Sequence, residues 1–120
     1  MLNLDTHVLL HAVGGELTRR ERQLLENDSW SVSGIVLWEI AKLDQLGRIE
    51  LDLESPDVRR ALAAVHAWPI TVEVASAIAR RGVRVDPADE PIAATSIVHG
   101  ASLLTRDRKL LASKRVPLAR

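Results

Sequence analysis

The chain has 120 residues, no cysteine, and 16 basic and 16 acidic residues that leave no net charge. This length fits one domain, the lack of cysteine excludes disulfides, thiolate metal sites and cysteine nucleophiles, and the balanced charge gives no sign of nucleic-acid binding. No apolar run approaches the ~20 residues of a membrane span, and no basic segment precedes an apolar one at the start, so we predict a cytoplasmic protein.

Short apolar segments alternate with helical patterns along the sequence. We expect strands at 1–4, 30–33, 102–105 and 116–118, with extended segments at 68–72 and 83–85. We expect helices at 6–13, 19–26, 34–46, 57–67, 73–81, 91–99 and 106–113. This alternation predicts βαβ units and therefore an α/β fold over residues 1–120, with helices on both faces of a mostly parallel sheet.

Glycines and capping residues mark where several of these helices begin and end. Gly14-Gly15 and Gly47 each follow a helical pattern, where glycine accepts the left-handed C-cap conformation at low cost. Thr18 and Glu21 have the spacing of a capping box. These signals support two short helices before residue 30 and a longer one after it.

Four carboxylates occupy positions that suggest a common site. Asp5 and Asp107 follow expected strands, and Asp89 precedes the helix that begins at residue 91. Glu39 falls inside the apolar arc of its helix, where desolvating a carboxylate costs several kcal/mol unless something pairs with it. Ligands bind at the carboxyl ends of the strands in such open sheets, so a fold of this kind can bring these acids together.

Each carboxylate also has an ordinary structural interpretation. Asp5, Asp89 and Asp107 are all placed to cap a helix, and Lys42 lies one turn from Glu39 and could neutralise it. Capping does not explain a glutamate in an apolar arc, whereas a hard divalent cation explains all four. Oxygen ligands favour Mg²⁺ or Mn²⁺ over zinc, and such a cation can hydrolyse phosphodiesters.

The remaining chemical groups give weaker signals. His7 and His11 are spaced i,i+4 but have no carboxylate base between them, so we interpret them as surface or core residues. Residues 106–120 contain six basic residues and one acid, which is typical of a solvated face and is also a possible phosphate contact.

Four sequence motifs follow one another along the chain. They are Leu-Asp-Thr-His-Val-Leu-Leu at 4–10, Val-Ser-Gly-Ile-Val-Leu-Trp-Glu-Ile-Ala at 32–41 with Leu-Gly-Arg-Ile at 46–49, Asp-Pro-Ala-Asp at 86–89 with Ile-Ala-Ala-Thr at 92–95, and Leu-Leu-Thr-Arg-Asp at 103–107. Taken in this order, they resemble the PIN domain family, and more narrowly the VapC toxin ribonucleases of type II toxin–antitoxin pairs. The resemblance implies an α/β/α sandwich and a Mg²⁺- or Mn²⁺-dependent endoribonuclease. Members of this kind are usually homodimers and are inhibited by a small cognate antitoxin, here a VapB-like one.

The resemblance also assigns roles to residues of the site. Asp5 and Asp89 would be the principal metal ligands, and Glu39 and Asp107 would complete the site directly or through water. Polar residues beside the acids, which could orient waters or ligands, would be Thr6, Ser33 and Thr105.

Glu90-Pro91 departs from the family pattern, because these toxins usually carry an Arg and then an apolar residue there. The exchange places an anion where a cation would lie near the scissile phosphate. It leaves open a catalytically weak module that binds RNA or the antitoxin. A receiver-like domain is a third interpretation, with Lys109 near its end, but it leaves Glu39 unexplained.

Overall fold

The computed structural model describes residues 1–81 and 85–120. Its strands are β1 (Leu2–Leu4), β2 (Trp30–Ser33), β3 (His66–Trp68) and β4 (Ser102–Leu104). Its helices are α1 (Thr6–Gly14), α2 (Arg19–Glu26), α3 (Gly34–Gln45), α4 (Pro56–Ala63), α5 (Val72–Arg81), α6 (Asp89–His99) and α7 (Arg108–Ala112).

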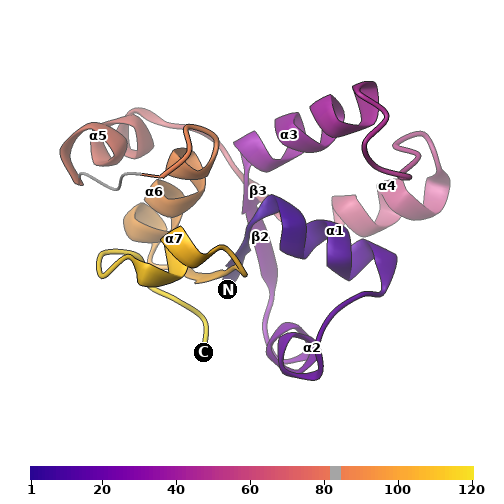
Figure 1. Ribbon diagram of the computed structural model, residues 1–120, viewed down its shortest axis with the longest axis horizontal. Helices are drawn as coiled ribbons and strands as arrows, with labels where there is room; N and C mark the ends of the chain where they lie inside the picture. The colour runs from indigo at the N-terminus through magenta and orange to yellow at the C-terminus, as the bar shows by residue number, and fades with distance from the viewer. Residues whose placement is uncertain (82–84) are drawn as a thin grey trace.

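The strands form one parallel sheet in the order β3-β2-β1-β4. Helices α1 to α4 lie on one side of this sheet and α5 to α7 on the other (Figure 1). The predicted three-layer α/β/α sandwich is therefore confirmed.

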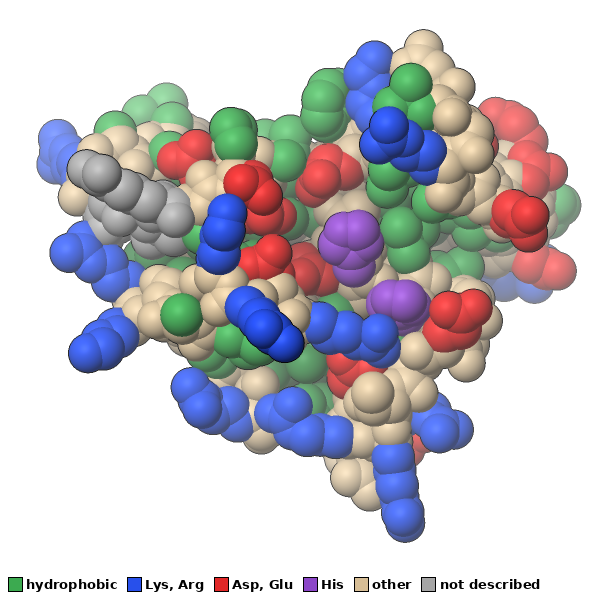
Figure 2. Space-filling view, in the orientation of Figure 1, with side chains coloured by type: hydrophobic (Ala, Val, Ile, Leu, Met, Phe, Trp, Pro, Cys, Tyr) green, Lys and Arg blue, Asp and Glu red, His purple; other side chains and the backbone are tan. Residues whose placement is uncertain are grey.

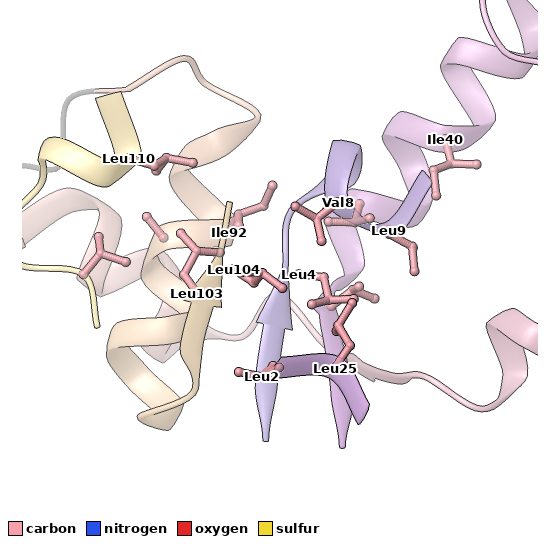
Figure 3. Close-up of a cluster of buried hydrophobic side chains, with 14 residues drawn as sticks. Leu2, Leu4, Val8, Leu9, Leu25, Ile40, Ile92, Leu103, Leu104 and Leu110 are labelled. Carbon is pink, nitrogen blue, oxygen red and sulfur yellow. The ribbon is translucent and has the colours of Figure 1, made fainter. Parts of the chain in front are cut away.

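The core lies between the sheet and both helix layers and consists of aliphatic side chains. Leu4 of β1 and Leu104 of β4 contribute to one cluster with Leu9 of α1, Ile40 of α3 and Ile92 of α6 (Figure 3). All five are 2% exposed or less. Burying each stabilises the fold by ~1.5–3 kcal/mol, so this cluster fixes the strand ends that carry the polar residues described below.

The cap signals in the sequence are found in the structure. Thr18 accepts a hydrogen bond from the backbone N–H of Glu21, and Glu21 accepts one from the N–H of Thr18, which completes the capping box of α2. Gly15 and Gly47 have φ of 74° and 67°, values that favour glycine, at the ends of α1 and α3.

Three predictions about elements need correction. The helix predicted at 57–67 ends at Ala63, and His66 and Ala67 belong to β3. The strand predicted at 116–118 is a single bridge between Leu118 and Leu103, and the last helix is shorter than 106–113. The predicted segment 83–85 lies mostly outside the described residues.

Within the described ranges, every helix falls short of the length and apolar character that crossing a membrane would require.

Candidate functional site

The carboxyl ends of β1 and β4 lie at the point where the strand order reverses. Strands β1, β2 and β3 follow one another toward one edge, whereas β4 returns to pair with β1 on its other side. Ligands bind at such a switch point in open α/β sheets, outside the carboxyl ends of the strands. Asp5 follows β1 there, and Thr105 follows β4.

Asp5 is buried and both of its carboxylate oxygens accept hydrogen bonds. Oδ1 accepts from the backbone N–H of Val8 at 2.8 Å and so caps α1, and Oδ2 accepts from the hydroxyl of Thr105. Burial raises the pKa of Asp5, while the hydrogen bonds from Thr105 and Val8 lower it and offset part of that effect. The capping interpretation of Asp5 is therefore correct, and the same carboxylate stands at the switch point.

Asp107 is joined to Asp5 through Thr105. The backbone N–H of Asp107 donates to Thr105 Oγ1 at 3.0 Å, and that hydroxyl in turn donates to Asp5. Asp107 also caps α7, because its Oδ1 accepts from the N–H groups of Lys109 at 2.9 Å and Leu110 at 3.1 Å. One hydroxyl thus links two acids that are about a hundred residues apart in sequence.

Glu39 projects from α3 and is held by Thr6. The Thr6 hydroxyl donates to Glu39 Oε1 at 2.6 Å. The alternative pairing with Lys42 is wrong, since Lys42 donates to Gln45 at 2.9 Å. The expected apolar arc is also incomplete, because Leu46 is 62% exposed and Glu39 is only half-buried.

Asp89 is the first residue of α6 and does not cap it, because Ala88 occupies the N-cap position. Its pKa is raised to about 6, first by burial and then by the negative charges of Asp107, Glu39, Asp5 and Asp86, in that order. The carboxylate of Asp89 is therefore close enough to the other predicted acids to be repelled by them.

All four predicted acids line one cavity of about 190 Å³. Its lining consists of Asp5, Thr6, His7, Glu39, Asp86, Ala88, Asp89 and Asp107. Asp and Glu side chains gather around a hollow in the middle of this face of the molecule (Figure 2). Ser33, also predicted beside the site, is buried at the end of β2 and caps α3 by accepting from the N–H of Ile35 at 3.4 Å.

The structure brings two residues to the cavity that the sequence did not single out. His7 follows Thr6 in the first turn of α1, and Asp86 precedes Asp89 by three residues. The sequence suggests a surface or core role for His7, and Asp86 enters only as part of the Asp-Pro-Ala-Asp motif at 86–89. This motif contains the fifth carboxylate at the rim, but an Asp that precedes a Pro is equally typical of a turn.

The donor set of the cavity fits a hard divalent cation. Its ionisable lining consists of carboxylates and one histidine, and oxygen ligands suit Mg²⁺ or Mn²⁺. Across the described residues, however, no three His, Asp or Glu side chains are grouped closely enough to hold a metal ion as they lie. Hydrogen bonds occupy Asp5, Glu39 and Asp107, and like charges keep carboxylates apart when nothing neutralises them.

Comparison with known proteins gives one family and a set of similar folds. The model of the family described as PIN domain matches residues 3–115. The comparison with curated proteins found no match.

Several solved structures cover 99% of the chain at 16–21% identity, a level that shows a common fold. A toxin–antitoxin complex from Klebsiella pneumoniae contains a chain with a TM-score of 0.73 and 21% identity, 97% of which is covered. FitAcB from Neisseria gonorrhoeae gives 0.69 and 20%, also with 97% covered. VapBC2 from Rickettsia felis, bound to a promoter DNA fragment, gives 0.66 and 16%, with 98% covered.

Proposed function

The chain belongs to the PIN domain family, whose members are generally nucleases, and on that basis we propose that it is a divalent-metal-dependent endoribonuclease acting as the toxin of a toxin–antitoxin pair. Membership of the PIN domain family excludes the receiver-like interpretation. The observation that carries the proposal is the convergence of Asp5, Glu39, Asp89 and Asp107 on one cavity at the switch point of the sheet.

The residues of the cavity divide into ligands and groups that orient them. Asp5, Glu39, Asp89 and Asp107 would hold Mg²⁺ or Mn²⁺ directly or through water. A bound cation supplies activation of a water and stabilisation of the leaving oxygen of a phosphodiester. Thr105 fixes one oxygen of Asp5 and the backbone of Asp107, and Thr6 fixes one oxygen of Glu39, so both threonines limit the positions that the acids adopt.

Partners and location follow from the same proposal. The structural neighbours include chains from toxin–antitoxin complexes, which supports a small cognate VapB-like antitoxin as the partner of this chain. We further propose a homodimer located in the cytoplasm, with RNA as the substrate.

A second candidate is a catalytically weak module that binds RNA or the antitoxin. The observation that favours it is Glu90, which lies beside Asp89 in the first turn of α6 where related toxins usually carry a cation. In this position Glu90 interacts favourably with the N-terminal end of the helix dipole, which gives it a structural role as well.

Cleavage of a mixed set of structured and single-stranded RNAs tests the first candidate. Purified chain, free of any partner, is expected to cut RNA with Mn²⁺ or Mg²⁺ and to stop in EDTA. Asp5→Asn and Asp89→Asn are each expected to abolish this cleavage, and Asp57→Asn on the exposed surface of α4 is the matched control. Binding of RNA without metal-dependent cleavage by the unaltered chain would favour the second candidate.

A further inference from the structure

The acidic cavity is poorly suited to attract a nucleic acid, because His7 is the one basic side chain among the described residues of its lining. Within the described residues, its lining includes no Lys or Arg, and the carboxylates that surround it repel a phosphodiester. A cation held in the cavity would neutralise part of this charge, but it contacts only the phosphate at which cleavage occurs. Affinity for the rest of the strand must come from outside the cavity.

Basic residues are concentrated on the side of the molecule that borders this cavity. Nine of the sixteen Lys and Arg residues lie in the segments 19–22 and 106–120, although the chain has no net charge. Lys and Arg side chains spread over α7, the C-terminal segment and α2, below the carboxylates of the hollow (Figure 2). The positive charge is therefore concentrated on one side of the molecule, although the chain as a whole carries no net charge.

Two of these nine residues, Arg106 and Lys109, already interact with acidic side chains. Arg106 donates to both oxygens of Glu21, at 2.8 and 2.6 Å, and Lys109 lies 3.6 Å from Asp86. Arg115 also has an interaction within the chain. These three residues are left out of the surface defined next.

The six other basic residues are exposed, and among the described residues no Asp or Glu side chain forms an ion pair with them. They are Arg19, Arg20 and Arg22 of α2 and Arg108, Lys114 and Arg120, and we call them the basic surface. Its two segments are in contact, because Arg20 donates to the carbonyl of Ala119 at 3.3 Å and lines a cavity together with Arg120. At its other end, Arg108 directly follows Asp107 of the site.

We propose that the basic surface binds the sugar–phosphate backbone of a single RNA strand whose scissile phosphate lies in the acidic cavity. The proposal rests on the function proposed above and adds the path of the substrate outside the site. Guanidinium groups without a carboxylate partner can bind phosphate oxygens in a bidentate manner, and several of them together contact a backbone whatever its sequence. An anionic membrane is less suited to this surface, since Leu111 and Met1 are the exposed large apolar side chains near it in the described chain, and α7 has five residues.

Binding is measured by fluorescence anisotropy in EDTA with a labelled single-stranded RNA, over a range of salt concentrations, so that cleavage does not interfere. About six phosphate contacts to a single strand give a slope of about −4 in log affinity against log salt. The variant Arg19→Gln/Arg20→Gln/Arg22→Gln is expected to bind more weakly and to reduce that slope by about 2. Arg108→Gln/Lys114→Gln, on the other segment, is expected to reduce it by about 1.4 and serves if the first variant fails to fold.

The matched control is Arg48→Gln/Arg60→Gln/Arg80→Gln, which removes three exposed arginines of α4, α5 and the segment after α3. Equal weakening by the control, an unchanged slope in both test variants, or tighter binding to anionic vesicles than to RNA would overturn the proposal. The same measurements separate this proposal from the proposed nuclease function. RNA binding through the basic surface without any cleavage would support the binding surface and contradict the nuclease function. Cleavage with an unchanged KM in both test variants would support the nuclease function and contradict the binding surface.

Discussion

Asp5 shows how one carboxylate serves the fold and the site together. One oxygen caps α1 and the other accepts from Thr105 at the switch point. Asparagine caps helices about as well as aspartate, so Asp5→Asn keeps the cap and removes the charge. This makes the substitution a test of the site with little effect on the fold, whereas Asp5→Ala would remove both functions and cost about 1 kcal/mol from the cap alone.

The raised pKa of Asp89 predicts how stability depends on pH. The pKa is about 6 in the folded chain against an ordinary value of 3.8, so the folded state binds the proton more tightly than the unfolded state does. The contribution of Asp89 to stability is therefore present at low pH and is lost as pH rises from about 4 to 6. In EDTA, the midpoint of urea unfolding is expected to fall as pH rises across this range, and to fall less in Asp89→Asn than in the unaltered chain.

Addition of Mn²⁺ to the unaltered chain is expected to remove the same decline, because the cation stabilises the ionised form. Asp57→Asn is again the control, since that aspartate is exposed on α4. A decline of equal size in Asp89→Asn would assign it to other groups.

The capped helix α2 is fastened to the loop that carries the site. Glu21 is 5% exposed and accepts two hydrogen bonds from Arg106, which stands between Thr105 and Asp107. Arg106 lowers the pKa of Glu21 to about 2, mainly through these hydrogen bonds. A residue on α2 thereby holds the segment that joins β4 to α7.

Arg106→Ala is expected to destabilise the chain by about 2 kcal/mol at pH 7, because it leaves the buried carboxylate of Glu21 without its ion-pair partner. The stabilising effect of the pair is present above pH 4.5 and is lost as pH falls toward 2, so the difference between the two proteins should narrow over that range. Denaturant midpoints at pH 7 and pH 3 provide the measurement. Arg108→Ala, an exposed position in the first turn of α7, should change stability by less than about 0.5 kcal/mol.

Element prediction succeeded where local chemistry and burial agreed. The capping box of α2 and the buried strand β2 were predicted with their observed bounds, because both have strong local signals. Strand β3 was missed because it is an edge strand with largely exposed residues, so its pattern carried no apolar alternation. Its Trp68 stacks on His99 of α6, with ring centroids 3.9 Å apart, a tertiary contact that periodicity does not reveal.

For the site, sequence supplied the acids but not their hydrogen bonds. Asp5, Asp89 and Asp107 could be predicted because each lies where an expected strand or helix begins or ends. That Thr105 bridges two of them, and that Thr6 rather than Lys42 holds Glu39, depends on how α1, α3 and β4 pack. Long-range packing of this kind leaves no local pattern in the sequence.

Metal binding should be visible in the stability of the whole molecule. A cation that binds only the folded state, at 100 times its dissociation constant, adds about 2.7 kcal/mol, which is several degrees in a domain of this size. The Tm of the partner-free chain is therefore expected to rise with Mn²⁺ or Mg²⁺ over its value in EDTA. Asp5→Asn and Asp89→Asn should each remove this rise in Tm. If the unaltered chain shows no rise at millimolar metal, the acids are helix caps and charges at the rim of the cavity and do not form a metal site.

The link between Asp5 and Thr105 has a consequence for protein synthesis. It joins two residues that are translated a hundred residues apart, and β1 pairs with β4 across the same interval. A nascent chain whose residues 102–107 are still inside the ribosome has neither the complete cavity nor the pairing of β1 with β4. The site therefore stays unfinished until residue 107 has emerged, and chains released before residue 105 lack Thr105 and Asp107 altogether.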